Sequence, residues 1–161
     1  QRQMCIRDRP TVAALRKALE DAAGVRGDEV LVEEYIHGRE FTVAVLDGRA
    51  LPVIEIRAPE GDYDFNNKYF GDAVHYDCPA KLEDEAAATL GSLCERAFAA
   101  VGARGWSRID ALQRADGSFA LLEINTSPGM TPHSLVPMAA RAVGMDYADL
   151  CLKVLSLARC D

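Results

Sequence analysis

Four side chains that can bind ions flank the dipeptide Asp116-Gly117 at two-residue spacing. Arg108 and Asp110 precede the dipeptide, and another pair, Glu123 and Asn125, follows it. If the dipeptide forms a two-residue hairpin turn, Asp110 lies opposite Glu123. Arg108 then lies opposite Asn125, and because side chains alternate along a strand, all four project from one face of the sheet.

Two carboxylates directly opposite each other repel, and a cation between them removes that repulsion. Asp110, Glu123 and Asn125 offer only oxygen ligands, which suit a hard ion such as Mg2+. Mg2+ seldom binds so few protein ligands alone and usually shares phosphate oxygens with a nucleotide. The hairpin is therefore a candidate site for magnesium and a nucleotide.

The hairpin by itself leaves alternatives open. A solvated strand face, on which Arg108 merely pairs with Asp110, explains the same residues equally well. The proposed register also places Leu112 and Leu121 on the shared face, nearer the turn. A register shifted by two residues would keep that face but change the pairs.

The segment 126–132, which follows Asn125, is small and polar and contains a glycine. The backbone N–H groups around Gly129 can approach an anion closely, since no Cβ is in the way. Ser134 then adds a hydroxyl at the start of a short helix, where the helix dipole favours a carboxylate. The alternative for Ser134 is an ordinary helix cap.

Hydrophobic periodicity predicts the elements that position these residues. Helices are expected at 11–23, 83–101 and 134–143, with a final helix capped by Asp146. Strands are expected at 30–36, 41–46, 50–56, 106–113 and 119–125, and residues 59–71 are expected to form a surface loop. The strands come mainly as hairpins with helices between the pairs, which predicts an α+β fold with antiparallel sheets.

The composition is that of an ordinary globular chain of 161 residues, with 27% charged residues and a net charge of -7. This charge disfavours a general nucleic-acid binder, which usually carries a basic patch. No apolar run is long enough to span a bilayer and no export leader is recognisable, so we expect a cytoplasmic protein without a membrane partner. The five cysteines form no C-x-x-C pair, which disfavours a zinc knuckle or a disulfide framework.

The first nine residues, QRQMCIRDR, show neither a helical nor a strand period and do not fit the sequence that follows. The string resembles the translation of a sequencing adapter. We therefore expect residues 1–9 to be a non-native leader and leave them out of the fold argument. A frayed native terminus is the alternative.

Several successive segments resemble consecutive blocks of the D-alanine–D-alanine ligases, which belong to the ATP-grasp family. They are VLVEEYIHGREFTVAVLDG, LPVIEI, NNKYF, GWSRIDALQRADGSFALLEINTSPGMT and HSLVPMAARAVGM. The resemblance runs from about Asp28 to the C-terminus in the family's order and spacing. It implies the C-terminal part of an ATP-grasp fold, with the remainder of the small lobe at 10–67 and the large lobe at 68–161.

The resemblance implies an activity. In this family ATP phosphorylates the carboxylate of one D-alanine, and the amine of a second attacks the acyl phosphate, which gives the dipeptide for peptidoglycan. Asp110, Glu123 and Asn125 would hold two Mg2+ ions, with Mn2+ as a substitute. Arg108 and the N–H of Gly129 would form the oxyanion hole.

The resemblance also assigns binding roles elsewhere. Ser134 and the backbone of Leu135 would hold the carboxylate of the acceptor D-alanine. Lys68 would bind the ATP phosphates from a lid, and Tyr69 in the same lid would border the acceptor pocket. Without the resemblance, a solvated loop is the preferred interpretation of both lid residues. The residues that would contact the nucleoside are Glu33, Glu34 and Ile36 at adenine and Glu40 at the ribose hydroxyls.

Two parts of the family have no counterpart in the sequence: the N-terminal donor-binding domain and a central segment with two nucleotide-binding lysines. We therefore expect the chain by itself to be inactive, and note that full-length ligases of this kind are often homodimers. One alternative function is a D-alanine–D-lactate ligase, which the Lys68-Tyr69 sequence disfavours. The other is a non-catalytic nucleotide-binding module, which the intact set of charged site residues disfavours.

Overall fold

The computed structural model describes residues 11–26, 32–57 and 74–159. The chain divides into two units, Gln1–Ile36 and His37–Asp161. The leader predicted at 1–9, the loop predicted at 59–71 and the lobe boundary predicted at 67/68 all lie outside the described residues. These three statements stay predictions.

The first unit contains helix α1 (Val12–Arg26), which runs three residues beyond the predicted end at residue 23. Thr11 precedes it, and its Oγ1 accepts a hydrogen bond from the Ala14 N–H at 3.1 Å. The strand predicted at 30–36 is wrong for its described part, because residues 32–36 form neither helix nor strand. A strand exists only where its N–H and C=O groups pair with a neighbouring strand, and no described strand pairs with this segment.

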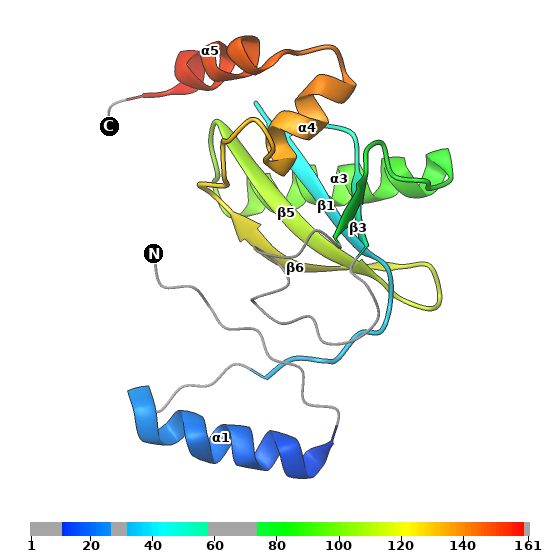
Figure 1. Cartoon of the computed structure of the whole chain (residues 1–161), viewed down its shortest axis with the longest axis vertical. Helices are drawn as coiled ribbons and strands as arrows, with labels where there is room; N and C mark the ends of the chain where they lie inside the picture. Colours follow the sequence, from blue (N-terminus) through cyan, green and yellow to red (C-terminus); the bar gives the residue numbers. More distant parts are fainter. Residues whose placement is uncertain (1–10, 27–31, 58–73, 160–161) are drawn as a thin grey trace. The chain divides into compact units, whose positions relative to one another are not determined.

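The second unit is built on one antiparallel sheet with the strand order β4-β3-β1-β5-β6, and β2 also pairs with β1 (Figure 1). The strands are β1 (Glu40–Leu46), β2 (Arg49–Ala50), β3 (Ile54–Arg57), β4 (His75–Asp77), β5 (Trp106–Gln113) and β6 (Phe119–Asn125). Strands β5 and β6 begin and end where the periodicity predicts. The α+β class with antiparallel pairing is confirmed.

The first hairpin, between β1 and β2, turns at Asp47-Gly48. Both residues have positive φ, 53° and 74°, which is the conformation of a two-residue type I′ turn. The strand predicted at 50–56 is interrupted at 51–53, between β2 and β3. Pro52 has no N–H to donate, so the ladder along β1 breaks there and resumes in β3.

The sheet has two faces with a separate hydrophobic core on each. Helix α3 (Asp84–Ala100) covers one of them, called here the α3 face. Its core contains Phe41, Val43, Val45, Ile109 and Ala111 of the sheet and Leu90, Cys94 and Phe98 of the helix. Helix α4 (Leu135–Ala142) packs on the other, the α4 face (Figure 1). The core there contains Ala44, Leu46 and Ile54 of the sheet and Val136, Ala139, Ala140 and Leu150 of the C-terminal helices.

The later helices end as predicted. Gly102 follows α3 and Gly144 follows α4, with φ of 66° and 80°. This left-handed conformation is the usual one for a glycine just past a helix. The last helix, α5 (Tyr147–Leu157), begins at the predicted cap, where Asp146 Oδ1 accepts from the Asp149 N–H at 2.8 Å.

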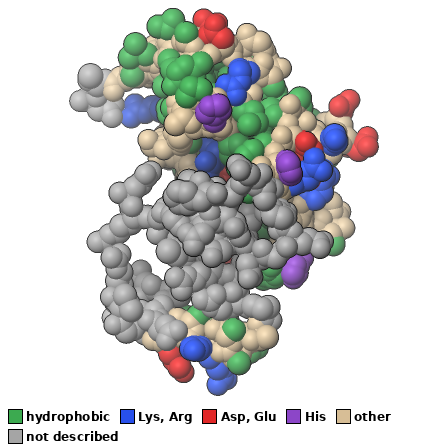
Figure 2. Space-filling model, viewed as in Figure 1, with side chains coloured by type: hydrophobic (Ala, Val, Ile, Leu, Met, Phe, Trp, Pro, Cys, Tyr) green, Lys and Arg blue, Asp and Glu red, His purple; other side chains and the backbone are tan. Residues whose placement is uncertain are grey.

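Helix α5 buries only one of its faces. Leu150 is fully buried, whereas Leu152 and Leu155 are 64% and 69% exposed. Figure 2 shows hydrophobic side chains at the surface over the C-terminal helices. Among the residues that the structure describes, no helix has both the length and the apolar character needed to cross a membrane.

Gly38, near the start of the second unit, lies where the backbone runs against the end of β5. The Arg39 carbonyl accepts from the Gln113 N–H at 2.9 Å. A Cβ on Gly38 would lie 1.8 Å from the Gln113 carbonyl oxygen, far inside contact distance. The site therefore has no room for a side chain.

Gly38→Ala is expected to lower the free energy of unfolding by about 1–3 kcal/mol or more, because main-chain atoms must move apart. Urea denaturation measures this change. The matched control is Gly91→Ala within α3, whose Cβ would meet only the Ala50 Cβ at 3.4 Å. It should be neutral or stabilise by about 0.5–1 kcal/mol, since alanine favours helix. Equal stability of the two variants would contradict the close approach at Gly38.

An ion pair joins the segment before β1 to β3. Arg39 donates from Nε and Nη2 to the two carboxylate oxygens of Glu55, both at 2.8 Å. Nη2 also donates to the Lys81 carbonyl at 2.8 Å, and the guanidinium lies 5.0 Å from the centroid of the Phe41 ring. Glu55 is buried, and the hydrogen bonds from Arg39 lower its pKa.

This pair should make stability depend on pH. Because the folded pKa of Glu55 lies below the unfolded value of about 4.3, its contribution is fully present above that pH. It is lost as the pH falls through the folded pKa. The loss of unfolding free energy in Glu55→Gln, measured by urea denaturation from pH 7 to pH 3, should therefore be greatest near neutrality and shrink in acid. A difference that is independent of pH would refute this account.

Candidate functional site

The four side chains predicted to meet across β5 and β6 do so on the α4 face. Arg108 pairs with Asn125 and Asp110 with Glu123, which confirms the predicted pairing. Asn125 Nδ2 lies 3.3 Å from Asp110 Oδ2 and 3.1 Å from Glu123 Oε1. The amide thus bridges the two carboxylates.

The turn between the two strands differs from the prediction. The Arg114 N–H donates to the Ser118 carbonyl at 2.8 Å, which leaves three loop residues, 115–117, instead of two. Gly117 takes the left-handed position of such a loop, with φ of 85°. Asp116 Oδ1 accepts from the N–H and the hydroxyl of Ser118, at 2.9 and 2.6 Å, and so stabilises the longer turn.

A second irregularity compensates for the longer turn. The register shifts between Asp110 and Ala111, so that Ala111 pairs with Leu121 and one extra residue of β6 is accommodated before Glu123. The predicted placement of Leu112 and Leu121 on one face is therefore wrong. Leu121 packs against the core of the α3 face instead. The bulge restores the pairing at the site itself.

Asp110 is 5% exposed, and hydrogen bonds surround its carboxylate. Arg108 donates to it twice, from Nε at 2.9 Å and from Nη2 at 2.7 Å. Thr42 Oγ1 donates at 2.6 Å from the adjacent strand β1. A charge this deeply buried is stabilised only by such paired donors.

Thr42 is a site residue that the sequence reasoning missed. Its signal is a polar residue in the otherwise apolar run Phe41–Leu46, and pairing of β1 with β5 sets it opposite Asp110. The sequence shows the polar residue but not the strand partner, because β1 and β5 are far apart in the chain.

Glu123 is in a different environment from Asp110. Its side chain is 30% exposed, and Arg108 Nη2 is 4.0 Å from its Oε1. The cluster therefore combines one buried carboxylate, fixed by its donors, with one carboxylate that is open to solvent. A cation can reach the partly exposed Glu123 carboxylate from solvent without a rearrangement of the surrounding core.

The oxygen atoms of the cluster suit magnesium only if a bound nucleotide supplies further oxygen ligands. No group of three His, Cys, Asp or Glu side chains able to hold a metal occurs among the described residues. Asp110, Glu123 and the amide oxygen of Asn125 supply three oxygen ligands. That is too few for a complete protein cage, but it suits Mg2+ that also binds phosphate oxygens.

The loop after β6 brings Gly129 and Ser134 together. A Cβ on Gly129 would lie 3.0 Å from Ser134 Oγ. That oxygen accepts from the Thr131 N–H at 3.1 Å and lies 2.8 Å from Thr131 Oγ1. Ser134 occupies the N-cap position of α4 without capping it through its side chain. The N–H of Leu135 therefore begins a helix whose N-cap side chain makes no capping hydrogen bond.

The remaining predicted residues fall in different parts of the chain. Glu40 begins β1, two residues before Thr42 and on the same face. Glu33, Glu34 and Ile36 belong to the first unit. The predicted lid residues Lys68 and Tyr69 lie outside the described residues.

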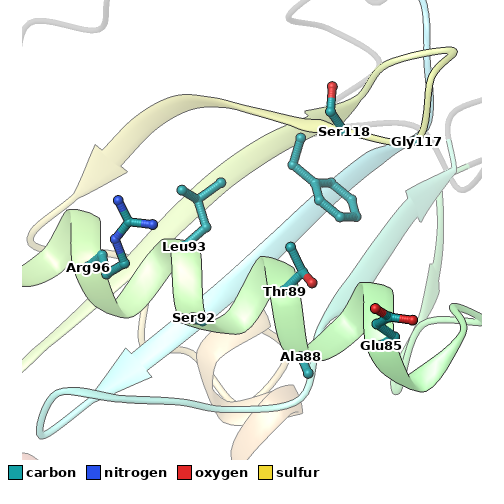
Figure 3. A pocket seen from close by; sticks show the side chains of 9 residues that line it. Glu85, Ala88, Thr89, Ser92, Leu93, Arg96, Gly117 and Ser118 are labelled. Atoms are coloured by element: carbon teal, nitrogen blue, oxygen red, sulfur yellow. The ribbon is translucent and has the colours of Figure 1, made fainter.

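A groove lies on the opposite side of the sheet, between α3 and the β5–β6 turn (Figure 3). Its lining includes Glu85, Thr89, Arg96 and Ser118. Phe119, which also lines it, packs against the core of the α3 face. None of the predicted site residues that the structure describes lines this groove, so it is separate from the carboxylate cluster.

Comparison with known protein families shows to which family the chain belongs. A family model described as the C-terminus of D-Ala-D-Ala ligase matches residues 6–156. The chain belongs to the D-alanine–D-alanine ligase family. The resemblance drawn from the motifs is thereby confirmed.

Individual relatives agree with the family assignment. The chain is 57% identical over 137 residues to a D-alanine–D-alanine ligase of Bordetella petrii, with 83% of this chain and 42% of the relative covered. It is 55% identical over 148 residues to the corresponding ligase of Bordetella pertussis, with 89% and 47% covered. The chain therefore spans less than half the length of these relatives.

Solved ligase structures share the fold. The D-alanine–D-alanine ligase of Bacillus anthracis, crystallised with ATP, aligns with a TM-score of 0.76 and 30% identity over 91% of this chain and 48% of that one. The D-Ala:D-Ser ligase VanG of Enterococcus faecalis aligns with a TM-score of 0.78 and 30% identity over 91% and 43%. These alignments confirm the C-terminal part of the ATP-grasp fold.

Thr42→Val is expected to lower the free energy of unfolding by about 1–3 kcal/mol, because the buried Asp110 loses a donor while the side chain keeps its shape. Urea denaturation measures the change. Thr42→Ser keeps the hydroxyl and is the control for the donor. If valine proved as stable as threonine, the hydrogen bond to Asp110 would contribute nothing.

Proposed function

We propose that a full-length ligase carrying this chain uses ATP to join two D-alanines through an acyl phosphate, for peptidoglycan synthesis. The observation that supports this most strongly is the cluster of Asp110, Glu123, Asn125 and Arg108, in a chain of the D-alanine–D-alanine ligase family. The protein would work in the cytoplasm, without a nucleic-acid or membrane partner, and as a homodimer. No observation favours a D-lactate ligase or a non-catalytic module.

One rotation of the Asn125 amide would convert the cluster into a cation site. At present its Nδ2 donates to both carboxylates, at 3.3 and 3.1 Å. Turning the amide over replaces the Nδ2 donor with the Oδ1 acceptor. It also releases one lone pair on Asp110 and one on Glu123. Three oxygens then face the same space, as a hard divalent cation requires.

Asp110, Glu123 and Asn125 would hold two Mg2+ ions, for which Mn2+ could substitute. Bound there with ATP, the ions would neutralise the charge of the phosphates. Asp110 holds the guanidinium of Arg108 through two hydrogen bonds, so the positive charge is oriented before any ligand arrives. An oriented charge stabilises a developing oxyanion without a cost in reorganisation.

Other residues would bind the substrates. Ser134 Oγ and the N–H of Leu135 would hold the acceptor carboxylate at the uncapped start of α4, and the Gly129 N–H would share the oxyanion with Arg108. Lys68 and Tyr69 would close over the phosphates and the acceptor. The nucleoside contacts would be Glu33, Glu34 and Ile36 at adenine and Glu40 at the ribose.

The test uses a chimera in which residues 32–161 replace the matching part of the Bordetella petrii ligase. Phosphate release that depends on D-alanine is the measurement. Glu123→Gln should lower it by about a hundredfold or more, because electrostatic stabilisation of phosphoryl transfer is lost. The control Glu85→Gln makes the same charge change on the α3 side and should leave the rate unchanged. Near-normal turnover of Glu123→Gln, with an unchanged melting temperature, would argue against the proposal.

A further inference from the structure

Two side chains from the C-terminal helices hold the loop 126–134 by its carbonyl groups. The hydroxyl of Tyr147, the first residue of α5, donates to the Met130 carbonyl at 2.6 Å. Arg141, in the last turn of α4, donates from Nη1 to the Pro132 carbonyl at 2.8 Å. The loop that carries Gly129 is therefore tied to two helices.

The two donors have rigid supports. Leu150 of α5 is fully buried, and Val136 of α4 is 1% exposed, so both helices are packed into the core of the α4 face. A donor on a packed helix holds its acceptor in a defined place, whereas a donor on another loop would move with it.

The hydrogen bond from Tyr147 also fixes an N–H group on the other side of the same peptide. A trans peptide is planar, and its C=O and N–H point in opposite directions. When Tyr147 holds the Met130 carbonyl, the Thr131 N–H must point the opposite way. There it meets Ser134 Oγ at 3.1 Å, and that oxygen lies 3.0 Å from the position of a Cβ on Gly129.

We propose that Tyr147 and Arg141 are positioning residues for the acceptor-binding loop. Through the Met130 carbonyl, Tyr147 sets the orientation of the 130–131 peptide, whose N–H holds Ser134 Oγ beside Gly129. Through the Pro132 carbonyl, Arg141 holds the 132–133 peptide that leads to Ser134. In this role neither residue would touch the substrates itself. The inference rests on the proposed function, in which Ser134 and Gly129 contact the acceptor and the oxyanion.

A positioning role of this kind predicts a selective kinetic effect in the chimera. Tyr147→Phe removes only the hydroxyl and should raise KM for the acceptor D-alanine by about three- to tenfold, the range that one lost hydrogen bond produces, with little change in KM for ATP. Arg141→Met should act in the same direction, and Arg141→Lys, which retains a donor, should recover part of the loss. Ser156→Ala is the control, since it removes an exposed hydroxyl of α5 that, among the described residues, donates to the Lys153 carbonyl of its own helix.

Hydrogen exchange of the Thr131 amide, measured by NMR on this chain, tests the positioning role without any catalytic assay. Exchange should be about three- to tenfold faster in Tyr147→Phe and unchanged in Ser156→Ala. Unchanged exchange in Tyr147→Phe would overturn the inference, and so would an equal rise in KM for ATP. Faster exchange with an unaltered acceptor KM would instead show that the loop is positioned but does not bind the acceptor, which refutes that part of the proposed function.

Discussion

A carboxylate buried inside a sheet constrains everything around it. Asp110 is almost inaccessible to solvent, so each of its oxygens must find donors within the protein. Thr42 supplies one from β1, and Arg108 supplies two along its own strand. This requirement couples the central strand pair to the orientation of the guanidinium. The charge that the proposed reaction needs is thus held in place by the same contacts that stabilise the sheet.

The two faces of the sheet differ in how their side chains are packed. On the α3 face, a core around Phe41, Leu90 and Ile109 packs the sheet against one long helix. On the α4 face, apolar packing is confined to the end covered by α4 and α5, which leaves the polar cluster beside it. An apolar core on one side makes a buried polar group on the other possible, because the free energy of burying apolar groups offsets the cost of burying the Asp110 side chain.

The loop between β6 and α4 connects these two regions. Asn125 ends the strand that carries the metal-binding candidates, and Ser134 begins the helix that carries the acceptor-binding candidates. Contacts from Tyr147 and Arg141 reach this loop from elements that follow it in the chain. In our proposal, Arg141 and Tyr147 thus position a loop whose substrate-binding candidates precede them in the sequence.

Features that depend on neighbouring residues could be predicted before the fold was known. Periodicity predicts the bounds of β5 and β6 and, to within one residue, those of α3 and α4. Alternation predicts the shared face of Asp110 and Glu123, and five sequence motifs in the family's order indicate the family. Contacts between distant residues account for the three-residue turn with its compensating bulge, the non-strand conformation of 32–36, and the hydrogen bonds of Thr42 and Tyr147. The physical reason is that periodicity and capping are properties of neighbouring residues, whereas strand pairing and buried hydrogen bonds join residues that only the folded chain brings together.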